Sequence, residues 1–519
     1  MISASKSFTP SPQQANIFTW VVEGTGSGIV NAVAGAGKTT TLLHSLRLML
    51  DTSEGSIALA AYNTKIAAEI LTKAMKMFSA DEMRRISIKT FHGFGFAAIR
   101  YATKSNRTPI KTDADKVQNI CDQLFVPVPY LSFVRKAVAL AKQVGIGIVT
   151  KETDPQAWLD MVDHYDLTEE LVEHYGDDAG NHVKPACQVA LKVLRESNRI
   201  WSQVIDFDDM IYIPILMRLR VWQNKWVLID EAQDTNVVRR MLARMMLDTR
   251  HGGRLIAVGD ENQAIYGFTG ADSEALRNIK TDFGAVDLDL TVTYRCPKSV
   301  VAYVKQFGSF PIEAHESAPE GTVASISSTE MMKMDLTPAD AILCRNTKPL
   351  VDMAYSLLRK GVACHVEGRD IGASLLKLVN RWKVTTLPAL VSKIETWRTK
   401  EVAKAEAARK PQKAEAISDR ADTILTIIEG LLSKGPATVA DLRAWIVSMV
   451  QDADKEATPT LPLCTGHRSK GREWKRVFWY GRAQYQPSKF ARQEWQIRQE
   501  INLMYVMGTR SMSELYEVS

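Results

Sequence analysis

Short apolar runs alternate with helix-forming stretches along much of the 519-residue sequence. The runs at 28–34 and 55–61 have the length of buried strands, and each is followed by a stretch of helical character. Two further apolar runs, 226–229 (WVLI) and 255–258 (LIAV), are each followed by acidic residues. This alternation predicts an α/β fold with parallel sheets and helices on both faces.

Two longer polar stretches interrupt the strand-like pattern and predict mainly helical insertions. A second strand-rich zone runs from 284 to 370, between the two stretches, and strand-like sequence returns at 476–480 (RVFWY). Within the second stretch, residues 399–422 are dense in Ala, Glu and Lys and are broken by Pro411, so we expect a solvated helix face there. We predict a first domain from 1–95 and 201–280 with an insertion at 96–200, and a second domain from 281–372 and 456–519 with an insertion at 373–455.

Composition excludes several classes of protein. The chain is 45% hydrophobic and 24% charged, which is ordinary for a globular protein, and its net charge of +6 leans weakly towards a polyanionic partner. The six cysteines are scattered without a CxxC pair, which argues against zinc or iron–sulfur sites and favours a reducing compartment. The N-terminus lacks the apolar core of a secretory signal, and no apolar run is long enough to span a membrane. We therefore expect a cytoplasmic protein, or a nuclear one if the source is eukaryotic, with no membrane partner.

The segment 31–40, NAVAGAGKTT, has the pattern of a phosphate-binding loop. Gly35 and Gly37 allow backbone N–H groups to turn onto phosphate oxygens, although Ala32 stands where the pattern usually has glycine. Lys38 would reach the β- and γ-phosphates, and the Thr39 hydroxyl would bind Mg²⁺. The predicted contacts to the nucleotide are Ala34, Gly35, Ala36, Gly37, Lys38, Thr39 and Thr40.

Two other strand ends carry matching chemistry. Asp230 is placed to bind Mg²⁺, and Glu231 to activate a water for attack on the γ-phosphate. Gln263 follows the 255–258 strand and is placed to sense that phosphate, while Tyr266 and Phe268 on the same loop can stack on bases. A P-loop kinase is disfavoured by this aromatic loop. A protein that uses ATP only as a binding switch is disfavoured by the water-activating acid.

As a whole, VGDENQAIYGFTGA (258–271) resembles the third motif of superfamily 1 helicases of the UvrD/Rep/PcrA class. Other motifs of the class follow in order, with a lean towards its F-box helicase group, although no F-box is found. These are FTPSPQQANIF (8–18), AYNTKIAAEI (61–70), KTFHGF (89–94), IDFDDM (205–210), LTVTYRCP (290–297), TGHRSKGREW (465–474) and EINLMYVMGTRS (500–511).

The resemblance implies a role for each matched residue. It implies adenine recognition by Gln13, with Gln14 as its rival, and by Tyr294, which carries more of the adenine packing because Thr40 stands where the class often has Arg. It implies ribose binding by Glu473, and γ-phosphate contacts from Arg295 and Arg510. The implied DNA contacts are Tyr62, Asn63, Lys65, Thr90, His92, Tyr266, Phe268 and His467.

Several of these positions have a structural alternative. Tyr62 is as well suited to a core position, Lys65 and His92 to exposed surface, and His467 to a hinge between domains. Asp208 and Asp209 form a second carboxylate pair, for which a helix cap or another structural role is at least as good a hypothesis as chemistry.

The resemblance implies two RecA-like domains with ATP and Mg²⁺ bound between them. It also implies an ATP-dependent helicase that acts on single-stranded and tailed double-stranded DNA with 3′→5′ movement. The alternative is a single-strand translocase that displaces proteins and unwinds little. We further expect a monomer that works with replication or recombination proteins.

Overall fold

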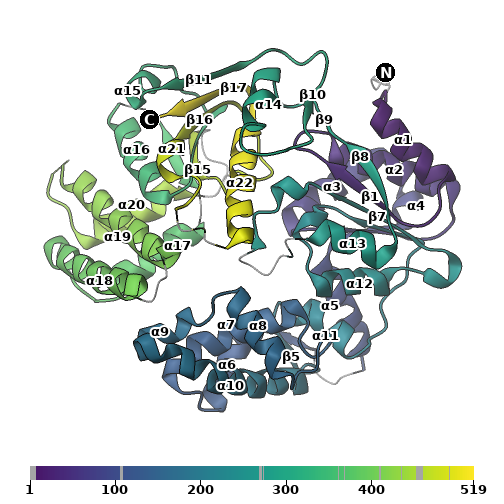
Figure 1. The fold of residues 1–519 in the computed structure, drawn as a ribbon, viewed down its shortest axis with the longest axis horizontal. Helices are drawn as coiled ribbons and strands as arrows, with labels where there is room; N and C mark the ends of the chain where they lie inside the picture. The colour runs from purple at the N-terminus through teal and green to yellow at the C-terminus, as the bar shows by residue number, and fades with distance from the viewer. Residues whose placement is uncertain are drawn as a thin grey trace. The chain divides into compact units, whose positions relative to one another are not determined.

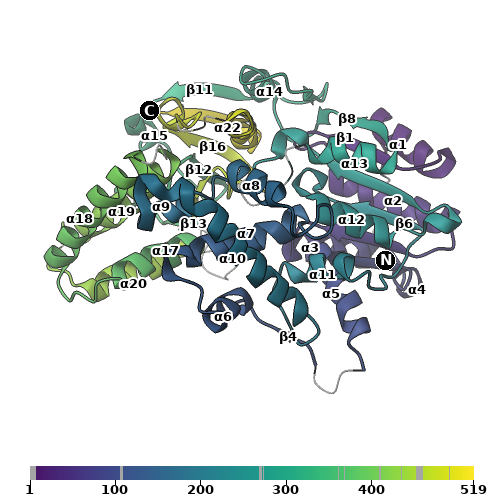
Figure 2. The ribbon, with the colours of Figure 1, turned by 60° about the horizontal axis from the view of Figure 1, so that its bottom comes forward.

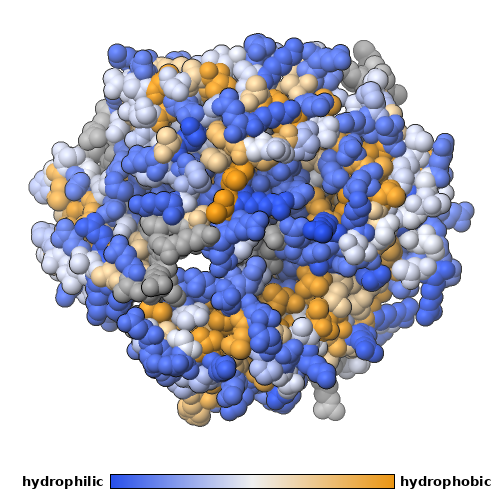
Figure 3. Space-filling model, viewed as in Figure 1, coloured by the Kyte–Doolittle hydropathy of each residue, from blue (hydrophilic) through white to orange (hydrophobic). Residues whose placement is uncertain are grey.

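The computed structural model describes residues 8–105, 109–267, 272, 274–360, 362–367, 369–407, 411–433, 435–451, 460–489, 491 and 493–519. The chain divides into two compact units, residues 1–291 and residues 292–519. Each unit contains its own parallel sheet, so the predicted α/β class with two parallel-sheet domains is confirmed (Figure 1). Among the described residues, no helix has both the length and the hydrophobicity needed to cross a bilayer. The face shown in Figure 3 carries scattered apolar residues among hydrophilic ones.

The sheet of the first unit has six strands in the order β3-β2-β6-β7-β1-β8, and all of its pairs are parallel. Every residue of its central strands β2 and β6 is buried, which explains why they read as continuous apolar runs. The sixth strand, β8, lies beyond residue 280, the predicted end of the first domain. Apolar and polar residues alternate in its sequence, VDLDL, and it pairs with β1 at the edge of the first sheet. The strands are β1 (Gly28–Ala32), β2 (Ile57–Ala61), β3 (Ile86–Thr90), β6 (Trp226–Ile229), β7 (Arg254–Gly259) and β8 (Val286–Leu290).

Helices cover this sheet, and one face packs against α5, α11, α12 and α13 in a single apolar core. Helices α2 and α3 each continue from the end of a strand, as expected for βαβ units. The helices are α1 (Pro12–Glu23), α2 (Lys38–Thr52), α3 (Thr64–Met77), α4 (Ala80–Met83), α5 (Phe91–Ala102), α11 (Asp209–Leu216), α12 (Val237–Met246) and α13 (Ala275–Phe283), with short 3₁₀ turns η2 (Ala232–Asp234), η3 (Thr249–His251) and η4 (Glu261–Gln263).

Between α5 and α11 the chain forms a helical region with its own apolar core. The core continues onto the inner faces of α5 and α11, where Ile99, Tyr212 and Ile213 belong to it. This region therefore packs directly on the helices that border the sheet. Its elements are β4 (Lys111–Thr112), α6 (Lys116–Gln123), α7 (Val128–Val144), α8 (Pro155–His164), α9 (Glu169–Tyr175), η1 (Gly176–Asp178), α10 (Ala179–Arg199) and β5 (Val204–Ile205).

The second unit has a seven-stranded parallel sheet in the order β11-β17-β16-β12-β15-β13-β14. The strands β9 and β10, which precede β11 in the chain, form a separate two-stranded parallel sheet. The strands are β9 (Val292–Thr293), β10 (Glu313–Ala314), β11 (Thr322–Ile326), β12 (Asp340–Cys344), β13 (Cys364–Glu367), β14 (Val450–Gln451), β15 (Leu461–Thr465), β16 (Trp474–Tyr480) and β17 (Ser511–Val518), and the flanking helices are α14 (Lys298–Val304), α15 (Ser328–Met331), α16 (Thr347–Arg359), α21 (Arg482–Tyr485) and α22 (Glu494–Gly508).

A helical group separates β13 from β14 and shares one core with the sheet of this unit. It contains α17 (Arg369–Asn380), α18 (Leu387–Ala407), α19 (Pro411–Leu432) and α20 (Val439–Met449). Helices α18 and α19 lie side by side in Figures 1 and 2, and Ala405, Ala414 and Ile417 form a small core there. Pro411 is the first residue of α19, a position where proline costs no hydrogen bond.

Candidate functional site

The phosphate loop joins β1 to α2 and adopts a backbone that requires glycine. Gly35 has φ of +72° and Gly37 has φ of +84°, in the left-handed region that other residues rarely adopt. A Cβ on Gly37 would lie 3.4 Å from Nε2 of Gln14. The Lys38 ammonium lies over the loop, 3.5 Å from the Val33 carbonyl oxygen. Together these features form a cradle of backbone N–H groups at a helix N-terminus, with a cation beside it.

The other predicted loop residues differ in exposure. Ala34 and Ala36 are buried, which leaves their backbone groups rather than their side chains to contact a ligand. Thr39 is half-buried at the start of α2, and Thr40 is exposed. Thr40 remains a predicted contact, at the position where the family often has Arg.

Two carboxylates follow β6, as the sequence predicts. Asp230 is 5% exposed, and burial together with the neighbouring Glu231 raises its pKa to about 7, against the opposing effect of Lys38. The effect of Lys38 on Asp230 brings the phosphate loop and this strand end into one electrostatic cluster. Glu231 has φ of +50° and ψ of +48°, an uncommon backbone conformation for a non-glycine residue. Such strain is concentrated at functional sites.

A chain of hydrogen bonds connects Glu231 to Gln263. The Gln233 side-chain amide donates to the Glu231 carboxylate, and its Oε1 accepts from the backbone N–H of Asp260 at 3.0 Å. Gln263 Nε2 donates to Asp260 Oδ2 at 2.7 Å. Gly259 allows this approach, because a Cβ there would lie 2.7 Å from Gln233 Oε1. Sequence reasoning missed Gln233 and Asp260, although each is a polar residue close behind an apolar strand.

The two candidate adenine-reading glutamines have different surroundings. Gln13 donates from Nε2 to the Thr291 hydroxyl at 2.8 Å and accepts from the Thr291 N–H at 2.9 Å. Gln14 is buried, caps its own helix through Ser11, and donates to Thr41 of α2 at 3.0 Å. Gln14 therefore supports the phosphate loop, whereas Gln13 fixes the end of β8.

Aromatic side chains from segments that are distant in sequence form two stacked pairs in the first unit. Tyr62 and Tyr266 stack with ring centroids 5.9 Å apart and planes 8° apart, and the Arg239 guanidinium lies 5.5 Å from the Tyr62 centroid. His92 stacks on Phe207 at 3.8 Å, and burial followed by the charge of Arg239 lowers the pKa of His92 to about 3. His92 is therefore neutral at physiological pH.

The structure thus forms two ring pairs from four segments of the chain, and Arg239 acts on a ring of each pair. Sequence reasoning missed Phe207, which is 60% exposed, and the only signal was its place between acidic residues in IDFDDM. Phe268, predicted to stack on bases, lies outside the described residues.

Two predicted DNA contacts have a structural task. The Asn63 side chain accepts the Ile66 N–H at 2.9 Å and caps α3, and the Thr90 hydroxyl accepts the Gly93 N–H at 3.1 Å and caps α5. Helix N-termini favour anions, so both caps mark ends that suit phosphate. Lys65 is exposed on the first turn of α3.

In the second unit, three predicted nucleotide contacts lie on two loops. Arg295 Nε donates to Glu473 Oε2 at 2.6 Å, which joins the loop after β9 to the loop before β16. Tyr294 is 52% exposed, and its ring centroid lies 4.8 Å from that of His315. Exposure of this ring suits a stacking role.

Arg510 and His467 are also held inside the second unit. Arg510 is 1% exposed, and its guanidinium donates to the carbonyls of Val506 at 2.7 Å and Arg472 at 3.1 Å, and to the Thr509 hydroxyl at 2.9 Å. These bonds fix its orientation, so little side-chain freedom remains to be lost on binding a ligand. Burial, with the charges of Arg345 and Lys470, lowers the pKa of His467 to about 3.

The carboxylates of IDFDDM form a buried charge cluster with the helical region. Asp209 pairs with Lys116 at 2.6 Å and with Lys142 at 2.7 Å, and Lys142 also pairs with Asp206. Asp209 and both lysines are at most 1% exposed. These contacts support a structural role for Asp209 rather than a chemical one. Burial and Asp206 raise the pKa of the neighbouring Asp208 to about 6.

Comparison with known proteins identifies the family. Residues 12–284, more than half of the chain, match the family described as the UvrD/REP helicase N-terminal domain. Residues 376–518 match the UvrD-like helicase C-terminal domain. The chain therefore belongs to the UvrD/Rep helicase family, and the resemblance inferred from its motifs is confirmed.

Individual relatives share about a quarter of their residues with the chain. It is 27% identical to the ATP-dependent DNA helicase Rep of Escherichia coli over 313 residues, 55% of this chain and 41% of Rep. It is 25% identical over 315 residues to a probable DNA helicase II homolog of Mycoplasma pneumoniae, 58% of this chain and 42% of that protein. It is 25% identical over 288 residues to the ATP-dependent DNA helicase PcrA of Staphylococcus epidermidis, 53% of this chain and 37% of PcrA. The chain spans about two fifths of the length of these relatives.

Proposed function

We propose that the chain is an ATP-dependent DNA helicase that moves along single-stranded DNA and couples each step to ATP hydrolysis. Family membership supports this proposal, as do relatives that carry the name ATP-dependent DNA helicase. The main observation in support of the proposal is a pair of contacts made by the segment after β7. Gln263 on this segment is bonded into the carboxylate cluster, and Tyr266, three residues later, stacks on Tyr62.

The nucleotide chemistry is assigned to the first unit. The glycine cradle and Lys38 fit the phosphates of ATP, and the buried Asp230 is an acid of the kind that binds Mg²⁺, which commonly has few protein ligands besides phosphate oxygens. Thr39 and Asp230 would hold the ion, whose charge would offset that of the phosphates. Glu231 would accept a proton from the attacking water, and Gln233 fixes its carboxylate in one orientation.

Coupling between ATP and DNA follows from the hydrogen-bond chain. A change at Glu231 can reach Gln263 through Gln233 and Asp260, and Gln263 shares its short segment with Tyr266. We infer that loss of the γ-phosphate shifts this segment and weakens the grip of Tyr266 on a base. Arg295 and Arg510 are proposed to neutralise charge on the γ-phosphoryl during hydrolysis.

Unwinding of tailed duplexes tests the proposal. We expect ATP-dependent unwinding of a duplex with a 3′ single-stranded tail and none with a 5′ tail, as 3′→5′ movement requires. Unwinding from the 5′ tail alone would contradict the direction. Displacement of streptavidin from a biotinylated strand without unwinding would identify the translocase alternative. The Glu231→Gln variant is the control for hydrolysis.

A further inference from the structure

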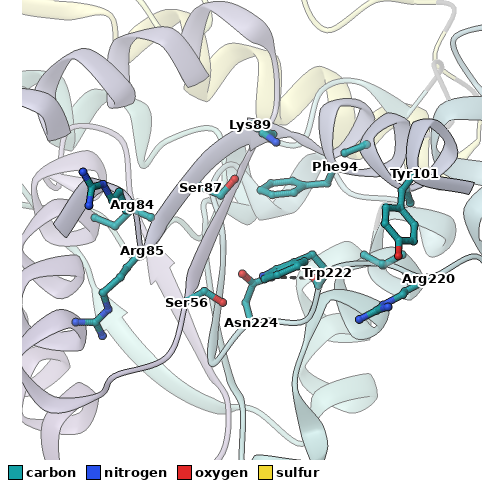
Figure 4. Close-up of a pocket in the computed structure, with 14 residues that line it drawn as sticks. Ser56, Arg84, Arg85, Ser87, Lys89, Phe94, Tyr101, Arg220, Trp222 and Asn224 are labelled. Carbon is teal, nitrogen blue, oxygen red and sulfur yellow. Dashed lines mark hydrogen bonds between the residues drawn. The ribbon is translucent and has the colours of Figure 1, made fainter. Parts of the chain in front are cut away.

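A cavity of about 490 Å³ opens along the edge strand of the first unit (Figure 4). Its 14 lining residues come from β3 and the turn before it, from α5, from Ser56 ahead of β2, and from the segment 220–224 ahead of β6. No function described above uses this cavity.

The cavity reaches the edge of the sheet opposite to the nucleotide site. Ser56, Arg85 and Asn224 each lie just before the first residue of a strand, whereas the phosphate loop and Asp230 follow strand ends. Since all these strands are parallel, the cavity residues lie at the amino ends of the strands and the nucleotide site lies at their carboxyl ends. At about 3.3 Å per residue, the strands separate them by roughly 15 Å. The cavity is therefore separate from the nucleotide site.

Aromatic rings form the walls of the cavity. In Figure 4 the rings of Phe94 and Trp222 border it from opposite sides, and Tyr101 closes one end. Trp222 is 76% exposed and Tyr101 is 49% exposed, so neither is placed there by core packing. These two exposed rings are therefore available to contact a ligand in the cavity.

The charged residues that line the cavity are all cations, one of which, Arg84, pairs with Asp81 at 3.1 Å. Arg84, Arg85, Lys89 and Arg220 line the cavity, and none of its 14 lining residues is Asp or Glu. The Lys89 ammonium lies 5.8 Å from the Phe94 centroid, and the Arg220 guanidinium lies 5.8 Å from that of Tyr101. Within the described part of the chain, neither Lys89 nor Arg220 forms an ion pair with a carboxylate. Rings flanked by cations suit a flat ligand that carries negative charge.

Two features indicate a long ligand rather than a single nucleotide. A second hollow of about 520 Å³ shares Arg220, Val221 and Trp222 with the cavity and adds Arg250. At the other end, Lys89 precedes Thr90, and Phe94 shares the first turn of α5 with His92. The cavity thus extends from the predicted DNA contacts towards another cation-bearing hollow.

We propose that this cavity is an additional binding site for single-stranded nucleic acid, which takes one unstacked base between Phe94 and Trp222 and phosphates on Lys89 and Arg220. The inference rests on the proposed function for the identity of its ligand. An acidic peptide would also satisfy the cations, but two opposed rings favour a base, which can stack on both faces.

Binding of fluorescent oligonucleotides to the full chain tests the proposal with Trp222→Ala and Arg220→Ala. A strand of about 30 nucleotides, longer than usual single-domain site sizes, should bind Trp222→Ala at least about 5-fold more weakly than the parent. Arg220→Ala should lower the slope of log Kd against log salt concentration by about 0.7, the value for one lost phosphate contact on a single strand. Phe125→Ala is the matched control, since Phe125 is 89% exposed elsewhere in the same unit, and it should bind as the parent does.

Cross-linking locates the contact independently of affinity. A strand that contains 4-thiothymidine should cross-link to peptides that include Trp222. Unchanged affinity and salt slope in both variants, with cross-links confined to peptides around Tyr62 and Tyr266, would overturn the inference and leave an acidic peptide as the ligand to test. If the parent bound no single strand at all, the proposed function itself would fail.

Discussion

Replacing the buried Lys142 should destabilise the first unit far more than replacing Lys136, an exposed lysine on the same helix. Lys142 on α7 is fully buried and pairs with Asp206 and Asp209. Burial lowers the pKa of the Lys142 ammonium, but the attraction of Asp209 and Asp206 outweighs it and leaves the pKa above its usual value. Lys142 is therefore charged at neutral pH, and its removal leaves two acids with only Lys116 as a buried cation.

The size of the effect follows from the burial. Loss of one partner from a buried ion pair costs about 3–5 kcal/mol, because the remaining charge keeps its desolvation penalty. We expect this loss in the free energy of unfolding of the first unit for Lys142→Met, which retains most of the side-chain volume. An unfolding entropy of about 2.1 cal/mol/K per residue gives this 291-residue unit about 1.6 °C of melting temperature per kcal/mol, so the shift should be about 5–8 °C.

Lys136 supplies the matched control. It also lies on α7 and pairs with Glu170, but it is 57% exposed, and exposed pairs contribute about 0–1 kcal/mol. Urea unfolding at neutral pH, followed by tryptophan fluorescence, compares Lys136→Met with Lys142→Met. Equal losses in the two variants would refute the reasoning, because they would mean that burial of this charge cluster has no energetic consequence.

Four further results are expected. Lys38→Ala should lose ATP turnover, while Glu231→Gln should bind a fluorescent nucleotide and not hydrolyse it; hydrolysis by Glu231→Gln at the parent rate would exclude the water-activating role. Arg510→Ala should lower kcat by about 10³-fold with nearly unchanged nucleotide affinity; lost affinity at constant kcat would make it a ground-state contact, and a melting curve controls for its burial. Tyr266→Ala should weaken single-strand affinity by about 1–3 kcal/mol and change DNA-free ATPase much less; equal losses of both would indicate a core role. The pKa of His467 is about 3 in the folded chain against 6.5 as its ordinary value, so the unfolded chain binds this proton first as pH falls. The contribution of His467 to stability should therefore fall from pH 6.5 downwards by about 1.4 kcal/mol per unit, and His467→Gln should reduce the slope of stability against pH by that amount in urea unfolding.

The backbone of the phosphate loop and the burial of the acid after β6 were predictable because each is encoded over a few adjacent residues. The left-handed backbone at Gly35 and Gly37, and the buried acid directly after an apolar strand, are properties of short segments. The parallel sheets followed from apolar runs at strand length. The strand β8 lies within the strand-rich zone predicted from residue 284, but it belongs to the first sheet rather than to the second domain, because nothing in its own sequence marks β1 as its partner.

Contacts between distant segments were not predictable. Lys116 and Asp209 are 93 positions apart, and nothing near either residue marks the other as its partner. The stacking of Phe207 on His92 likewise depends on how α5 and α11 pack. A helix cap and a phosphate contact both favour Asn or Thr before a helix, so sequence alone could not separate these roles for Asn63 and Thr90.

Coupling of ATP hydrolysis to DNA is the central claim, and the ATPase rate with and without single-stranded DNA tests it most directly. The steady-state rate of the parent chain should rise with DNA concentration to a plateau, and Glu231→Gln should show neither the basal nor the stimulated rate. A parent rate that is the same with and without saturating single-stranded DNA would contradict the claim, because hydrolysis would then proceed without reference to the strand.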